Sequence, residues 1–481
     1  MRRIVPALVA CCILTLSSCS TKSVLRFEKF GAAAGNGAFL SAVSDIKKQP
    51  KLYGKNNLFL YNMDIGMLYH YAGVYDSSTS YLLKASQVYD DLFTRSVSNE
   101  AASLLINDNV RPYRSKPYEL VLLHQTLQYN YLAAGQPDEA LVEGKAVQLL
   151  FNEWERKNAK DNHYFSDGMF HYITSMVYDE LGQTDEAMIS LYKSVEAYKQ
   201  GPVALPPEVA AYAYQMLRKN NRTEDVEKLK LKPEGPAPTG PRGFDNNQSE
   251  IVVIGYAGRG PALVENQWWG YWISGGLLVL HHSKPGGQDE TMAMPAPGLS
   301  EGEHGKADKG GKTSSGTTVF IKVALPAVRT FPSETDHFTV INNVDSRHME
   351  TITINNLDQQ AEKQREDAQA SVVMRTVIRV VTRTIAAQEA KKKMETNSGL
   401  ANLFINIATD VVSSQMEKAD TRCCFFIPKT VQIARMPVVP GVYSITVQAR
   451  DRGGAVIGSK IFASIDVKPH TKRFVFYSSL R

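Results

Sequence analysis

A short pattern occurs three times in the first half of the chain, with an aromatic residue, a glycine, an acid and a small residue at identical offsets. The glycine suits the left-handed end of one helix, and the acid suits the start of the next helix, where the helix dipole is positive. The small residue lets two helices approach closely. This repeat predicts helix pairs stacked in series. Its copies are Tyr69-x3-Gly73-x2-Asp76-x-Ser78, Tyr131-x3-Gly135-x2-Asp138-x-Ala140 and Tyr178-x3-Gly182-x2-Asp185-x-Ala187.

Apolar and amphipathic segments flank each glycine, and a weaker fourth pair is expected within 207–230. The whole pattern resembles tetratricopeptide-type repeats over residues 55–231. Its glycines are 62 (135 − 73) and 47 (182 − 135) residues apart, against about 34 in the standard repeat, so long loops are expected between the pairs. The resemblance implies an α-solenoid whose groove binds a protein or peptide partner.

Four ring-bearing residues are candidates for lining this groove: Tyr129, Tyr164, His171 and Tyr172. The alternative is that they belong to the core, because aromatic rings at helical spacing bury large apolar areas. The sequence leaves both interpretations open.

The beginning of the chain has the order of an export signal. Arg2 and Arg3 precede an apolar run that is too short to span a bilayer. The stretch Leu16-Ser17-Ser18-Cys19 resembles a bacterial lipobox, which implies removal of residues 1–18 and a diacylglycerol thioether on Cys19. Several acyl chains give lasting attachment to a membrane. The serine after Cys19, where aspartate would signal retention at the inner membrane, favours the periplasmic side of the outer membrane. The alternative is an ordinary cleaved signal.

Composition excludes several classes of protein. Loss of Arg2 and Arg3 lowers the formal charge from +5 to +3 (5 − 2), too small an excess for a nucleic-acid binder. Cys423 and Cys424 are adjacent, which is poor geometry for a disulfide, and two cysteines do not complete a zinc site. We expect buried free thiols, no metal and no cofactor.

The expected order of segments is a lipidated N-terminus and connecting segment at 19–54, followed by the helical repeats at 55–231. Proline and glycine are concentrated at 232–249, which predicts a linker after the repeats. Residues 250–481 contain β-branched runs separated by turns, so a mixed, mainly antiparallel β domain follows and the fold class is α+β. Residues 285–316 are glycine-rich and polar and predict an exposed loop. Trp268, Trp269 and Trp272 lie close together, either buried in a β core or exposed as a patch that suits a lipid interface.

Helices inserted at 358–416 are expected to form a hairpin, the first over 358–396 and the second over 400–416. Arg375, Arg379 and Arg383 recur every fourth residue of the first helix and therefore share one face. This face either contacts anionic headgroups or glycan carboxylates, or is simply solvated or paired with acids.

Several short motifs together resemble a family of bacterial lipoproteins with repeat-helical first halves, over nearly the whole mature chain; the resemblance implies no activity. No His-Glu-x-x-His or Gly-x-Ser-x-Gly spacing occurs, so we expect no catalytic residues. The sequence predicts a lipid-anchored, protein-binding scaffold facing the periplasm. The alternative is a structural lipoprotein that contacts cell-wall glycan or anionic lipid through the arginine face. The motifs are Gly258-Arg259-Gly260-Pro261, Ala324-Leu325-Pro326, Ala419-Asp420-Thr421-Arg422, Gln432-Ile433-Ala434-Arg435 and Pro440-Gly441-x-Tyr443.

Overall fold

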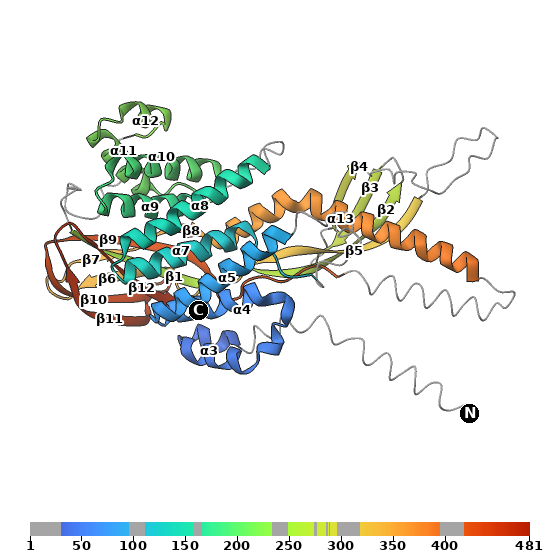
Figure 1. Ribbon diagram of the computed structural model, residues 1–481, viewed down its shortest axis with the longest axis horizontal. Coiled ribbons are helices and arrows are strands. Elements are labelled where there is room, and N and C mark those ends of the chain that lie inside the picture. Colours follow the sequence, from blue (N-terminus) through green and yellow to red (C-terminus); the bar gives the residue numbers. More distant parts are fainter. Residues whose placement is uncertain are drawn as a thin grey trace.

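A computed structural model describes residues 30–95, 111–157, 166–232, 249–273, 277–284, 287, 289–295, 318–394 and 418–481. Within these ranges the protein is α+β, with helices followed by strands in three sheets (Figure 1). The predicted signal, Cys19 and the predicted helix at 400–416 lie outside the described residues, as does most of the predicted linker.

The helical half consists of consecutive pairs, as the repeat predicts, including the weaker fourth pair. Short 3-10 turns connect the first helix to the pairs. The helices are α3 (Phe39–Lys48), α4 (Leu58–Tyr71), α5 (Tyr75–Arg95), α7 (Pro117–Ala133), α8 (Pro137–Lys157), α9 (Gly168–Glu180), α10 (Thr184–Gln200), α11 (Pro207–Lys219) and α12 (Thr223–Lys228), and the turns are η1 (Pro50–Leu52) and η2 (Lys55–Asn57).

The repeated glycines end the first helix of each pair in the left-handed conformation, which confirms the prediction. Their φ angles are +76° at Gly73, +71° at Gly135 and +72° at Gly182. In each copy the backbone N–H after the glycine donates to the carbonyl of the repeated tyrosine at 2.9 Å, which closes a Schellman turn. Asn221, with φ 61°, takes the corresponding place between α11 and α12.

The strands form three four-stranded sheets. The central sheet has the order β12-β1-β9-β8, the outer sheet β11-β10-β6-β7, and the distal sheet β4-β3-β2-β5. Pairing is antiparallel except between β1 and β12, which run parallel. The strands are β1 (Ser249–Arg259), β2 (Ala262–Ile273), β3 (Leu277–Ser283), β4 (Asp289–Pro295), β5 (Thr318–Arg329), β6 (His337–Asn342), β7 (His348–Glu350), β8 (Ile352–Asn356), β9 (Pro428–Val438), β10 (Gly441–Arg450), β11 (Val456–Val467) and β12 (Lys472–Ser479).

The central sheet is buried on both faces. Along β1, Val252, Ile254 and Tyr256 belong to the core shared with the helical half. Ile251 and Val253 alternate with them and belong to the core between the central and outer sheets. Helices, central sheet and outer sheet therefore form three layers, and the two regions predicted as separate domains share one apolar core.

The distal sheet lies at the opposite end of the molecule, where α13 (Leu357–Met394) packs along one of its faces (Figure 1). Val373, Val377 and Val381 of α13 form a core with the buried side chains of β2 and β3. These are Trp268, Trp272, Leu278 and Leu280. The loop predicted at 285–316 is wrong in part, because β4 pairs with β3 there. Met292 and Met294 alternate with small residues and pack on this core, a short strand pattern hidden in a polar, glycine-rich stretch.

Candidate functional site

The inner face of the helical half, where the repeat resemblance implies a partner, is occupied by the chain's own β half. His70 of α4 places Nε2 at 2.8 Å from the Tyr256 hydroxyl of β1 and Nδ1 at 2.7 Å from Asn130 Oδ1. The ring of Phe476 from β12 lies 5.2 Å from that of Tyr129. Strands of the central sheet therefore fill the space that a separate partner would need.

Two of the predicted groove residues, Tyr129 and Tyr172, are part of this contact, whereas His171 packs against Phe151 and Phe170 within the helical half. Tyr129 is 0% exposed, and His171 and Tyr172 are each 3% exposed, whereas Tyr164 lies outside the described residues. The Tyr172 hydroxyl accepts a hydrogen bond from Arg435 Nη1 of β9 at 3.2 Å. Their positions are those of core residues, and contact with an external partner stays a prediction.

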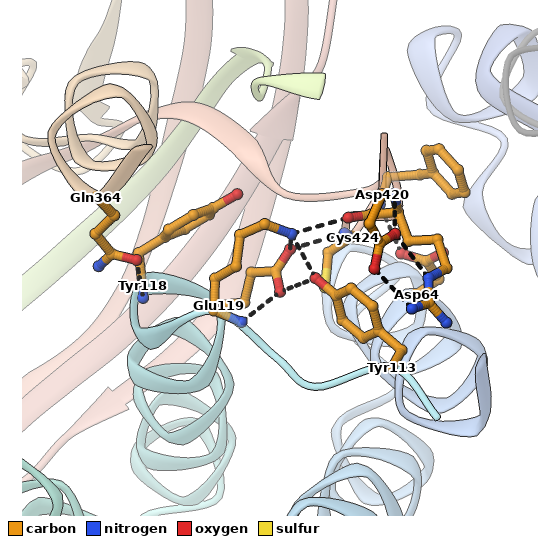
Figure 2. A network of polar contacts seen from close by, with 10 residues as sticks. Asp64, Tyr113, Tyr118, Glu119, Gln364, Asp420 and Cys424 are labelled. Carbon is orange, nitrogen blue, oxygen red and sulfur yellow. Dashed lines mark hydrogen bonds and ion pairs between the residues drawn. The ribbon is translucent and has the colours of Figure 1, made fainter. Parts of the chain in front are cut away.

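A segment of the β half, residues 419–427, lies against α4 and α7 in the manner of a bound peptide (Figure 2). The backbone N–H of Cys424 donates to Glu119 Oε1 at 3.0 Å, and that of Phe425 donates to Asp64 Oδ1 at 2.9 Å. The Tyr71 hydroxyl donates to the Phe426 carbonyl at 2.8 Å. Helical side chains thus bind the backbone of this inserted segment, while Cys424, Phe426 and Ile427 pack in the core shared with the helices.

Two buried carboxyl groups make the contact. The Tyr53 hydroxyl donates to Asp64 Oδ2 at 2.7 Å, and the backbone N–H of Lys116 donates to Glu119 Oε2 at 3.0 Å. Burial raises the pKa of Asp64 to about 7, against the opposing effect of its hydrogen bonds from Tyr53 and the Phe425 backbone. Asp64 interrupts the apolar run of α4, and Glu119 directly precedes four apolar residues, 120–123, of α7. This is a local signal in the sequence, but no role was predicted for either acid.

Arg422 anchors the start of the inserted segment. Its guanidinium pairs with Asp420 through two hydrogen bonds of 2.8 and 2.6 Å and also donates to Asn57 Oδ1 at 3.0 Å. Lys116 Nζ donates to the Arg422 carbonyl at 2.8 Å. The Ala-Asp-Thr-Arg motif therefore forms the polar entry of the segment into the helical half.

A second ion pair is buried where the central sheet meets α9 and α11. Arg435 donates to both carboxylate oxygens of Glu250 at 2.8 and 2.7 Å, and its guanidinium lies 4.2 Å from the Tyr212 ring centre. Burial alone would raise the pKa of Glu250, but Arg435 outweighs it, so the pKa is lowered. This pair fixes β1 and β9 against the last helix pairs.

The described residues show no arrangement suited to metal chemistry, since no group of three or more His, Cys, Asp or Glu side chains converges among them. Cys423 and Cys424 are free and buried, as predicted. Burial raises the pKa of Cys423 to about 11, so its thiol is unreactive at neutral pH. Over the same part of the chain, every helix is too short or too polar to span a bilayer.

The arginine face of α13 differs from the expectation. Arg375 is exposed, but Arg379 is 2% exposed, and the Arg383 side chain lies outside the described residues. Arg379 therefore does not share an exposed face with Arg375, because the packed side of α13 is wider than the arginine spacing suggested, and the neighbouring Thr376 is buried as well. Contact of this helix with glycan or lipid stays a prediction.

The tryptophan cluster is divided between a buried and an exposed face, and contact of the exposed face with lipid stays a prediction. Trp268 and Trp272 point into the core under α13, at 8% and 2% exposure. The opposite face of the distal sheet carries large apolar side chains that are 39% to 51% exposed. We call this surface the aromatic face; it comprises Trp269, Tyr271 and Ile273 of β2, Leu277 of β3 and Phe320 of β5.

The aromatic face is continuous because β2 lies between β3 and β5. Tyr271 is directly opposite Phe320, with ring centres 5.4 Å apart, and the ring of Trp269 lies 5.0 Å from that of His281 on β3. The sheet is stiffened from behind by α13. A contiguous apolar surface of this kind, rimmed by polar side chains such as Lys322, is typical of an interaction site.

The chain matches no protein-family model and no curated protein. Among solved structures, it is similar to the nearly identical TPR-like repeats of a putative kinesin light chain from Podosopora anserina, at 14% identity over 44% of this chain and 93% of that chain, with a TM-score of 0.29. A singly substituted form of the same repeats gives 16% identity, 44% and 92% coverage and a TM-score of 0.28. The helix-pair fold is established by the chain's own turns and packing, and neither likeness assigns it a function.

Proposed function

We propose that this protein is a lipid-anchored, non-catalytic scaffold of the bacterial cell envelope that binds a protein partner through the aromatic face. Cys19 carries the lipid and holds the chain to the periplasmic side of the outer membrane. The observation that carries the binding role is the continuous exposed surface around Tyr271 and Phe320. Aromatic residues are enriched at protein interfaces, where they supply most of the binding energy.

The inner face of the helices is a poorer site for the partner. Residues 419–427 and the central sheet occupy it, and Asp64 and Glu119 already bind the backbone of the inserted segment. The helical half therefore supports the β half in this proposal, and the partner binds at the distal end of the molecule. The cell-wall alternative has less support, because Arg379 is buried and Arg375 is the exposed one of these two arginines.

Site-specific photocrosslinking in intact envelopes tests the binding role. A photoreactive phenylalanine at Tyr271 is expected to yield one defined protein adduct. The matched control is Val142 of α8, which is also apolar and is 63% exposed. The double variant Tyr271→Ser/Phe320→Ser should abolish co-purification of the crosslinked partner, whereas Val142→Ser should retain it. The same adducts from both positions would refute the aromatic face as the specific surface.

The anchor has its own test, which does not depend on the partner. Mass spectrometry of the mature N-terminal peptide is expected to show a diacylglyceryl group on Cys19, and Cys19→Ala should prevent its addition. A mature chain that begins at another residue without lipid would contradict the anchor and leave the aromatic face untouched.

A further inference from the structure

A shallow pocket of about 440 Å³ lies at the surface of the first helices. Its walls come from α3 and from Tyr69 of α4. The lining residues are Leu40, Val43, Ser44, Lys47, Lys48 and Tyr69, a combination of ammonium, hydroxyl and apolar groups. All six of these residues belong to the helical half.

Lys47 is held in place at the pocket by two tyrosines. Its Nζ donates to the Tyr69 hydroxyl at 2.8 Å and lies 5.0 and 4.9 Å from the ring centres of Tyr69 and Tyr81. Lys84 Nζ lies 4.9 Å from the Tyr81 ring on α5. Two positive charges are therefore fixed over aromatic rings at the protein surface.

The surrounding chain is strongly biased toward positive charge. Residues 36–63 contain four lysines, all of them exposed, and a single acid, Asp45. Asp45 approaches one of these lysines, Lys48, at 3.7 Å. Leu40 and Leu58 are each at least half exposed in the same stretch. Lysines combined with exposed leucines and tyrosines complement an anionic, amphipathic surface. The lysines are Lys47, Lys48, Lys51 and Lys55.

The proposed tether places this surface beside a membrane. Phe30, the first described residue, stands eleven positions (30 − 19) after Cys19. Fully extended, such a segment reaches roughly 40 Å. The region of α3 is therefore the first part of the described fold that the anchor brings to the headgroups.

We propose that the basic surface formed by Lys47, Lys48, Lys84, Leu40 and Tyr69 rests on anionic phospholipid headgroups of the membrane that holds Cys19. The lysines bind lipid phosphates, while Leu40 and the tyrosine ring enter the interface. This second contact goes beyond the partner site and fixes how the scaffold stands on the membrane. This contact depends on the proposed Cys19 anchor only because the anchor brings the basic surface to the membrane.

Vesicle cosedimentation with the mature chain carrying Cys19→Ala tests the contact without the lipid. We expect this chain to bind vesicles that contain phosphatidylglycerol and to bind phosphatidylcholine vesicles much more weakly. Each lysine near an anionic surface contributes about fivefold in affinity. The Lys47→Gln/Lys48→Gln variant should therefore bind phosphatidylglycerol vesicles about 25-fold (5 × 5) more weakly.

Lys145→Gln/Lys228→Gln is the matched control, because it removes the same charge from exposed positions on α8 and α12. It should bind like the parent chain, and circular dichroism should show that both double variants are folded. Equal loss in the two double variants, or no sedimentation of the parent with phosphatidylglycerol vesicles at low salt, would overturn the proposal. Either failure leaves Cys19 lipidation to be decided by the mass of the N-terminal peptide.

Discussion

Two buried titratable side chains between helices and strands respond to pH in opposite directions. Burial lowers the pKa of His70 to about 4, so the folded protein holds it neutral between Asn130 and Tyr256. Burial raises the pKa of Asp64 to about 7, so the folded protein favours its protonated form below neutrality. The stability that comes from His70 is lost as pH falls, and the stability that comes from Asp64 is lost as pH rises.

Asp64→Asn should remove the second effect. The amide mimics the protonated acid, since its oxygen can accept from the Phe425 N–H while its NH₂ donates to Tyr53. Between about pH 4 and 7 the folded parent binds up to one more proton than the unfolded chain. As pH rises through this range, the free energy of unfolding of the parent should therefore fall by up to about 1.4 kcal/mol per pH unit relative to that of the variant. Urea unfolding of both proteins across this range measures the difference. A constant difference would show that Asp64 is already ionised at low pH.

Arg435 and Glu250 should show strong coupling in a double-mutant cycle. Arg435→Met leaves a buried carboxylate without its partner, so we expect a loss of about 3–5 kcal/mol in the free energy of unfolding. Arg435→Met/Glu250→Leu removes both charges and should recover much of that loss. Urea unfolding of the single and double variants measures the coupling. A double variant as unstable as the sum of the singles would contradict a paired role.

At the scale of elements, the repeated turns at Gly73 and Gly182 depend on their glycines for conformation and not for space, whereas at Gly135 a Cβ would also lie 3.2 Å from Arg473 Nη1. A Cβ at Gly182 would meet nothing within 4 Å, yet its φ is +72°. Gly182→Ala should therefore cost about 1–2 kcal/mol. Gly182→Asn should cost less, because asparagine tolerates this conformation and Asn221 already occupies the equivalent turn.

The control for this series is Gly35→Ala, a site with open space and no left-handed φ. Thermal unfolding of the three variants should rank Gly35→Ala above Gly182→Asn and Gly182→Asn above Gly182→Ala. Equal melting temperatures for the two Gly182 variants would show that backbone strain does not limit the turn.

The sequence predicted the elements whose signals are local. Glycine, tyrosine and acid at fixed offsets determine each helix pair, and alternating β-branched residues mark most strands. It did not predict β4, whose Met292 and Met294 gain their meaning only when β3 lies beside them. Nor did it predict that Asp64 and Glu119 bind residues 419–427. The sequence near each helix does not indicate which distant segment will contact it, and the hydrogen-bonded residues are 305 positions apart for Glu119 and 361 for Asp64.

At the scale of the molecule, the central sheet is covered by helices on one face and by the outer sheet on the other. Tyr256 and Phe476 extend from it into the helical core. We therefore expect the helical and β halves to unfold together. Calorimetry of the mature chain should show one transition for both halves, and residues 19–232 expressed alone should fail to form a stable monomer. A folded, soluble helical fragment with native helix content would contradict this dependence.

The parallel pairing of β1 with β12 sets the order in which the chain can become native. Ile251 lies opposite Arg473, 222 residues later (473 − 251). One edge of β1 and the part of the inner helical face that Phe476 contacts stay uncovered until the last strand arrives. Such surfaces invite aggregation while folding is incomplete. A chain that crosses a membrane from its N-terminus therefore remains far from its final state until its C-terminus has followed. If the chain is exported as proposed, this delay would leave it unfolded enough to pass through a translocon, and the waiting helices would need protection during that interval.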